Sequence, residues 1–243
     1  MTTAARERLR VRLPVIVVSA GAWAVLASAP EMLSPHVHGG VRVPVWTWGV
    51  GWAVMLAAMM LPLLVAPLRH VRDRSFARRR PRAVALFLLG YVLPWMIAGA
   101  ILMLSGVAAG ESGTSFWLLL ALALVWQCSP ARQRCSNRGH GHPPLAPAGA
   151  GADLDVLRFG IAHGSWCVGS CWAVMLLALS APGAHLAAMA GASVWLLAER
   201  MDGPERPRWR FPFPSRAARA IAASTAWLGR RPAPLVADQT FQT

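Results

Sequence analysis

Six stretches of the chain are almost free of charged residues, and short polar or basic segments separate them. They lie at about 13–29, 47–68, 83–107, 115–128, 159–181 and 183–199. A helix rises 1.5 Å per residue, so about 20 apolar residues cross a hydrocarbon core of about 30 Å. Most of the stretches approach that length, although 115–128 is short. The pattern predicts an all-α fold, a polytopic transmembrane helical bundle of about six spans.

Positive charge is spread unevenly over the segments between these stretches. The formal net charge is +14, and all 24 basic residues are arginines. They gather before the first stretch, between the second and third, between the fourth and fifth, and after the sixth, whereas Arg42 alone lies on the other side. Basic residues accumulate on the cytosolic side of membrane proteins, so both termini are expected in the cytosol. The expected parts are a cytosolic N-terminus at 1–12, a six-helix transmembrane domain at 13–200, and a basic, proline-rich cytosolic tail at 201–243.

The basic segments also bear on partners and location. They adjoin apolar stretches, which favours contact with membrane lipid headgroups and argues against nucleic acid as a partner. Arginine without lysine, beside abundant alanine, glycine and proline, is typical of a GC-rich bacterial genome. We therefore expect a multi-pass protein of a bacterial inner (cytoplasmic) membrane.

Two segments leave alternatives open. The arginines at Arg6 to Arg12, the apolar run after them and the sequence Ala27-Ser28-Ala29 imitate a secretory signal with its cleavage site. We favour retention as a helix; cleavage would leave five spans, with the later helices oriented as before. The stretch 215–229 mixes apolar and arginine residues, which suits either a helix on the inner membrane surface or a disordered segment.

The fifth stretch carries the clearest chemistry. His163, Cys167, Cys171 and Met175 recur every four residues, so they share one face of a helix at steps of about 6 Å. Imidazole, thiolate and thioether groups are the soft donors that select copper(I), with zinc as the alternative ion. A disulfide within this helix is unfavourable, because Cβ atoms four residues apart are about 5–6 Å apart and a disulfide needs about 3.5–4.5 Å.

The second stretch offers further sulfur donors. Met55 and Met59 share a face and Met60 adjoins them, just before the helix-perturbing Pro62. We predict that this helix faces the fifth and that the two build a metal site between them. Methionine is also ordinary core filler, which is the competing interpretation. The motif Gly160-x-x-x-Gly164 predicts close approach of a partner helix to the fifth.

Other donors lie outside the apolar stretches. The inner loop after the fourth stretch contains Cys128, Cys135, His140 and His142. They predict either a cytosolic entry or exit point for metal or a set of reduced thiols and solvated imidazoles. His36 and His38 are candidate metal collectors on the outer side.

The remaining charged and polar residues exclude several enzyme classes. Glu199 and Arg200 end the sixth stretch and are expected to pair at the inner interface. The sequence has no phosphate-binding loop, no paired-carboxylate site and no nucleophile with its base, which argues against a hydrolase or kinase.

Several motifs resemble a known family. They are Ala57-Ala58-Met59-Met60-Leu61-Pro62, Gly90-Tyr91-x-x-x-Trp95, Gln127-x-Ser129-Pro130 leading to Cys135, and Cys167-Val168-Gly169-Ser170-Cys171-Trp172-x-x-Met175. Together they resemble the predicted metal-binding integral membrane proteins of bacteria, which are similar to membrane copper chaperones linked to tyrosinases and laccases. The likeness covers roughly residues 45 to 200.

The resemblance implies metal roles for Cys167 and Cys171, with Met59 and Met60 as the second patch. The chain departs from the family pattern at Ser170, where the family often has a second adjacent cysteine. It departs again at Arg138, where the family often has a cysteine three residues after Cys135. These departures argue against a large thiolate cluster.

The sequence therefore predicts a copper(I)-binding membrane protein that handles or delivers copper, without bond-making catalysis. Cys167 and Cys171 would hold the ion, His163 would receive it near the cytosolic face, and Met175 with Met59 would pass it outward. A copper-receiving protein is the expected partner, and the oligomeric state stays open. The alternatives are a membrane thiol-disulfide oxidoreductase and a noncatalytic assembly subunit of a membrane complex.

Overall fold

The computed structural model describes residues 3–29, 45–104, 116–149, 151–181 and 184–229, and within these ranges the chain is helical with no strand. The elements are α1 (Thr3–Ser28), α2 (Val45–Met60), the 3-10 helix η2 (Leu61–Leu64), α3 (Val65–Asp73), α4 (Arg80–Leu104), α5 (Phe116–Cys128), α6 (Pro130–Arg138), α7 (Gly151–Leu179), α8 (His185–Arg200) and α9 (Ser215–Gly229). The prediction of an all-α bundle is confirmed. His36, His38 and Arg42 lie outside the described residues.

Four helical segments are long and apolar enough to cross a membrane. They are Leu9–Ser28, Trp46–Asp73, Arg80–Leu102 and Gly151–Leu179. The shorter helices α5 and α8 occupy the predicted fourth and sixth stretches, with 13 and 16 residues. Helices therefore lie at all six predicted positions, and four of them have the length and composition of a full span.

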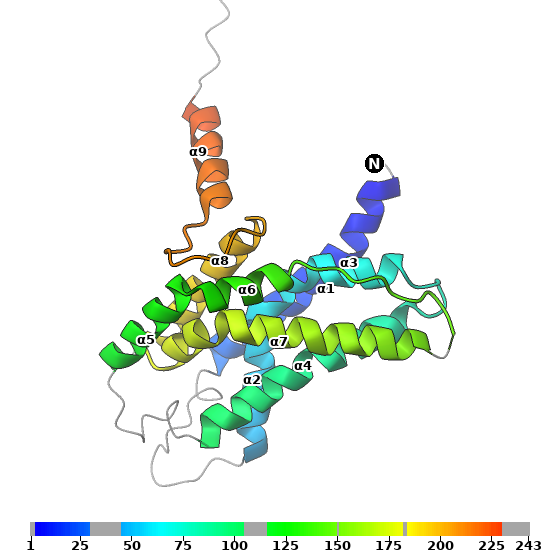
Figure 1. The fold of residues 1–243 in the computed structure, drawn as a ribbon, viewed down its shortest axis with the longest axis horizontal. Coiled ribbons are helices and arrows are strands. Elements are labelled where there is room, and N and C mark those ends of the chain that lie inside the picture. Colours follow the sequence, from blue (N-terminus) through cyan, green and yellow to red (C-terminus); the bar gives the residue numbers. More distant parts are fainter. Residues whose placement is uncertain (1–2, 30–44, 105–115, 150, 182–183, 230–243) are drawn as a thin grey trace, which may run out of the picture.

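Helix α7 lies at the centre of the bundle. It packs against α4, α5, α6 and α8, and Figure 1 shows it crossing the middle with α4 below and α6 above. Its closest approach is to α4. A Cβ atom at Gly164 would lie 2.5 Å from the carbonyl oxygen of Tyr91, and one at Gly90 would lie 2.6 Å from that of Leu157. The predicted glycine-mediated contact is confirmed, and its partner is α4.

The second membrane segment is bent at Pro62. Proline lacks an N–H, so the carbonyl of Ala58 loses the helical partner it would have four residues later. The hydroxyl of Ser19 in α1 donates to that carbonyl at 2.7 Å. The chain then turns through η2 into α3. This break places Met60 at the junction between α2 and η2, within the core.

Basic residues gather at one end of the bundle, which we call the arginine-rich end (residues 69–82, 130–158 and 200–210). Helix α6 lies here, inside a segment expected to be a loop; it starts with Pro130 after Ser129, whose hydroxyl accepts the N–H of Arg132 at 3.1 Å. The segment after α6 is fixed by Arg79, which donates to the carbonyl of Pro147 at 3.0 Å and pairs with Asp153.

The outer surface of α4 is apolar. Leu89, Leu93, Ile97 and Ile101 are exposed at four-residue spacing, which forms a continuous stripe suited to lipid. Helix α9 contacts α8 at its start and then points away from the rest of the bundle (Figure 1). The tail segment 215–229 is therefore helical, and its position on the inner membrane surface stays a prediction.

Candidate metal centre

A cluster of sulfur-bearing side chains lies in the core of the bundle. All are at most 5% exposed and belong to one contiguous core: Met55, Met59, Met60, Cys167, Cys171 and Met175. The four-residue spacing on α7 and the methionine patch on α2 therefore meet in the same interior.

Cys167 is at the centre of this cluster. Its Sγ atom lies 4.0 Å from Sδ of Met60, and the hydroxyl of Tyr91 donates to it at 3.2 Å. With metal–sulfur bonds of about 2.3 Å, two sulfur atoms 4.0 Å apart subtend roughly 120° at a shared ion. That is the angle of a trigonal site with one further ligand.

Cys171 lies one turn further along α7. Its Sγ atom is buried and lies 3.3 Å from the hydroxyl of Ser170. No three Cys, His, Asp or Glu side chains converge on a metal-sized point in the described residues. Among those residues a site with three ligands at Cys167 would have to include methionine, a donor that suits copper(I) better than zinc.

Helix α4 contributes two polar groups that the analysis of soft donors did not single out. Tyr91 is the only tyrosine in the chain and is 2% exposed. Trp95 lies one turn further along α4, and no hydrogen-bond partner of its buried Nε1 atom is found among the described residues. The hydroxyl of Tyr91 could have indicated this role in the sequence, because a polar group inside an apolar span is energetically costly and often functional.

The backbones of α2 and α7 do not pack closely together, so the predicted facing of these helices is limited to contact between side chains. Met60 reaches Cys167, while α4 lies closest to α7 and also packs against α2. The indole of Trp52 in α2 donates to the carbonyl of Trp95 in α4 at 3.0 Å. The site is therefore built by three helices. Met55, Met59 and Met175 belong to the same buried core.

His163 packs against aromatic rings of α7 and α4. Its ring lies 5.7 Å from that of Phe159 and 6.0 Å from that of Tyr91, measured between centroids. The guanidinium of Arg200 lies 3.4 Å from its Nε2 atom and also donates to the carbonyl of Gly139 at 3.1 Å. Arginine can only donate, so Nε2 of His163 accepts. A metal ion could reach this nitrogen only by displacing Arg200.

Cys135 lies on another side of α7. A Cβ atom at Gly169 would be 2.8 Å from Cys135 Sγ, so this thiol packs on α7 at Gly169. Gly169 is two residues from each of Cys167 and Cys171, about 200° around the helix, so it faces away from them. Burial raises the pKa of the Cys135 thiol, which keeps it protonated at neutral pH. The structure does not bring Cys135 into the sulfur cluster.

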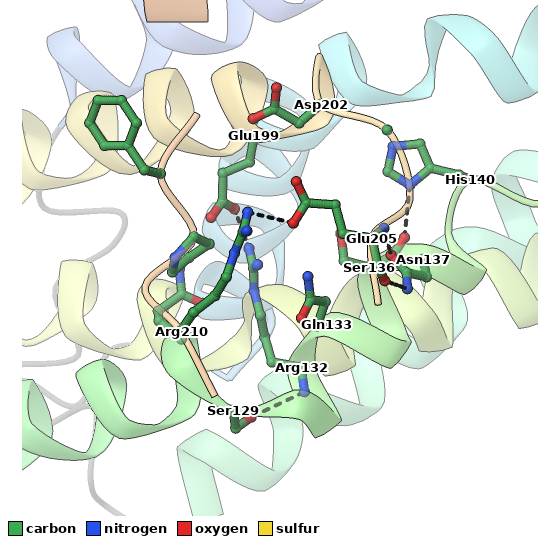
Figure 2. A pocket seen from close by; sticks show the side chains of 14 residues that line it. Ser129, Arg132, Gln133, Ser136, Asn137, His140, Glu199, Asp202, Glu205 and Arg210 are labelled. Carbon is green, nitrogen blue, oxygen red and sulfur yellow. Dashed lines mark hydrogen bonds and ion pairs between the residues drawn. The ribbon is translucent and has the colours of Figure 1, made fainter. Parts of the chain in front are cut away.

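A small polar pocket of about 50 Å³ lies between α6 and the segment after α8 (Figure 2). Arg132 of α6 points across it to pair with Glu199 of α8, and Arg210 pairs with Glu205. The expected pairing of Glu199 with Arg200 is wrong, because the carboxylate binds Arg132 while Arg200 points to His163. The pair of Arg132 and Glu199 fastens α6 to α8.

A larger and more open pocket of about 600 Å³ lies at the arginine-rich end. Its walls include His142, Phe159, His163 and Trp166. Partial burial lowers the pKa of His142, and the nearby His70 lowers it further, so the neutral imidazole is favoured. The pocket reaches from the surface to the side of α7 that carries His163.

Similarity to known proteins bears directly on this site. A family model described as a copper chaperone, PpoB2, matches residues 49–212. The chain belongs to the PpoB2 copper chaperone family. The matched region contains every member of the sulfur cluster, and it confirms the resemblance to copper-chaperone-like proteins. No curated protein and no solved structure matches the chain.

Proposed function

We propose that this copper chaperone family member holds copper(I) inside a membrane-embedded helical bundle and passes it to a receiving protein. The observation that carries the proposal is the buried contact between Cys167 Sγ and Met60 Sδ at 4.0 Å. A thiolate and a thioether within reach of one ion form a soft site that suits copper(I).

The ligands are assigned from this contact outward. Cys167 and Met60 hold the ion, and Cys171 supplies the third sulfur from the next turn of α7. Met59, Met55 and Met175 are neighbouring thioethers that exchange with these ligands as the ion moves. Several weak soft donors in one core allow transfer without a large movement of any helix.

The surrounding groups stabilise the metal-bound form. Copper(I) binds the thiolate and so releases the thiol proton. The hydroxyl of Tyr91 already donates to Cys167, and the N–H of Trp95 is available as a second donor. Thiolate and copper(I) together carry no net charge, which reduces the cost of placing the ion in an apolar core.

The orientation follows from charge. The arginine-rich end contains most of the described basic residues, so it faces the cytosol of a bacterial inner membrane, with both termini inside. Parts 1–12, 13–200 and 201–243 then act as N-terminal segment, six-helix membrane domain and cytosolic tail. Copper enters or leaves through the pocket at this end.

Two alternative functions make different demands. A thiol-disulfide oxidoreductase would need a partner thiol near Cys167 and Cys171, and Cys135 packs on a different side of α7. An assembly subunit would use the same residues for packing alone and would bind no copper. Copper content therefore separates the proposal from the assembly subunit, and trapping of a mixed disulfide separates the oxidoreductase from both.

The test is copper(I) content of the purified, reduced protein in detergent. We expect stoichiometric copper with sulfur ligands in X-ray absorption, lost in Cys167→Ser/Cys171→Ser. The matched control is Cys128→Ser/Cys135→Ser, which removes the other two cysteines of the chain and should keep the copper. Equal loss in both double variants, or no copper in the unmodified protein after loading, would refute the proposal.

A further inference from the structure

Imidazole rings from distant parts of the sequence meet at the arginine-rich end. The ring of His70, at the end of α3, lies 5.1 Å from that of His142 in the segment after α6. Both rings also pack near Phe159 of α7, at 5.8 Å and 6.5 Å. His70 had no part in the metal site predicted from the sequence, and the two rings lie outside the sulfur cluster.

The hydrogen bonding of His70 prepares it as a ligand. Its Nε2 atom lies 2.8 Å from the carbonyl oxygen of Pro143, and a carbonyl can only accept. Nε2 therefore carries the proton and Nδ1 carries the lone pair. A histidine that binds a metal commonly donates its other N–H to a backbone carbonyl in this way, which fixes the tautomer.

His142 completes the pair from the solvent side. It is exposed and lines the 600 Å³ pocket together with His163. Metal–nitrogen bonds of about 2.0–2.1 Å put the ring centroids of a linear two-histidine unit roughly 6.3 Å apart. The rings now lie 5.1 Å apart, so the exposed His142 ring would move outward by about 1 Å to bind the ion. Copper(I) is a closed-shell ion that accepts two ligands, and imidazole suits copper.

The pair leads toward the sulfur cluster. The ring of Phe159 lies between the pair and His163, 5.7 Å from the latter. His163 lies beside Tyr91, whose hydroxyl contacts Cys167. The order from solvent to core is therefore imidazole pair, aromatic ring, buried imidazole and thiol.

We propose that His70 and His142 form a second copper(I) site, a two-nitrogen loading site at the mouth of the bundle. This inference rests on the proposed function, since it assigns the entry point for the same cargo. The ion is bound there by nitrogen, then passes Phe159 to His163 and on to Cys167. The competing role for His70 is structural, as a tether for the segment at Pro143.

The experiment separates the two sites by their donor atoms. In Cys167→Ser/Cys171→Ser/Met60→Leu, which lacks the three sulfur ligands assigned above, we expect one copper(I) with a nitrogen shell in X-ray absorption. Adding His70→Gln and His142→Gln should remove it; glutamine at 70 keeps an N–H that can reach the carbonyl of Pro143.

Two controls keep the result interpretable. His185→Gln changes a histidine at the start of α8, away from the pair, and should leave the nitrogen-bound copper in place. His142→Gln alone alters an exposed side chain, so it preserves the fold if the double change does not. In the otherwise unmodified protein it should slow arrival of copper at the thiols by about tenfold, the size of effect typical of a weakened metal shell.

The outcomes distinguish this inference from the proposed function. Nitrogen-bound copper that survives His70→Gln/His142→Gln, or its absence from the triple variant, would overturn the loading site while leaving sulfur-bound copper untouched. Absence of sulfur-bound copper from the unmodified protein, with nitrogen-bound copper present, would instead count against the proposed function. A His142→Gln protein that loads its thiols at the unmodified rate would also contradict the inference, because His142 would then be only a surface residue.

Discussion

The sulfur cluster and the histidine pair differ in every property that governs metal binding. Cys167 and Met60 are buried, soft and held by helices, whereas His142 is exposed and lies in an irregular segment tied down by His70. Softer donors in a drier environment bind copper(I) more tightly. The two proposed sites would therefore form a gradient, from an accessible nitrogen site to a sulfur site that retains the ion.

Removing the central thiol should have the largest effect on this contrast. For Cys167→Ser we expect copper(I) affinity at the sulfur site to fall more than about a hundredfold, beyond the loss caused by outer-shell changes. Competition with a copper(I) chelator measures it. Cys135→Ser is the control, since this thiol packs on Gly169, and an equal fall there would mean that both thiols share one site.

Widening the contact between α4 and α7 should have the second-largest effect. In Gly160→Ala the new Cβ would press on the carbonyl oxygen of Phe87, which forces the helices apart. We expect the free energy of unfolding to fall by about 1–3 kcal/mol, with weaker copper binding because Tyr91 moves from Cys167. Thermal unfolding in detergent measures the change.

The matched control for that helix contact is Gly191→Ala in α8. A Cβ there would meet nothing within 4 Å, so alanine should raise stability by about 0.5–1 kcal/mol through helix propensity. Opposite signs for the two glycines are the expected result. Destabilisation of equal size at both positions would contradict the close contact as the cause.

Exchanging one thioether should separate ligation from packing. Met60→Leu nearly conserves volume, so unfolding free energy should change by less than about 1.5 kcal/mol. Copper(I) affinity should nevertheless fall by about tenfold, because leucine has no donor atom. Met189→Leu changes an equally buried methionine of α8 and should leave affinity unaltered. An unchanged affinity in Met60→Leu would remove this residue from the ligand set.

The smallest effect is expected at the hydroxyl of Tyr91. Tyr91→Phe removes the hydrogen bond to Cys167 and should weaken copper(I) binding by about 0.5–1.5 kcal/mol. A chelator titration of the variant beside the unmodified protein measures it. Binding that strengthens instead would show that the hydroxyl competes with the metal for the thiol.

The sequence predicted the positions of the helices and of the sulfur donors better than it predicted which helices pack together. Charge-free stretches place membrane helices directly, and four-residue spacing places Cys167 and Cys171 on one face. The start of α7 was missed because Asp153 and Arg158 made its first turns look like loop, although Asp153 occupies the favourable N-terminal end and pairs with Arg79. Helix α6 could have been predicted from Ser129 and Pro130, a typical N-cap residue followed by proline at the first helical position.

Partner helices were harder to predict for a physical reason. Gly160 and Gly164 indicate that some helix comes close, but only the folded chain shows that this helix is α4, with Gly90 at the contact. Likewise nothing in the local sequence places His70 beside His142. Contacts between distant segments depend on the packing of the whole bundle, which periodicity does not encode.

Arg200 gives the path to the interior an electrical property of its own. Its guanidinium occupies Nε2 of His163, the nitrogen that an incoming ion would need. When copper(I) takes that nitrogen and Arg200 withdraws toward solvent, one monovalent cation replaces another. In the proposed transfer this exchange would be isoelectric, so the poorly screened region around His163 would gain no charge as the metal passes.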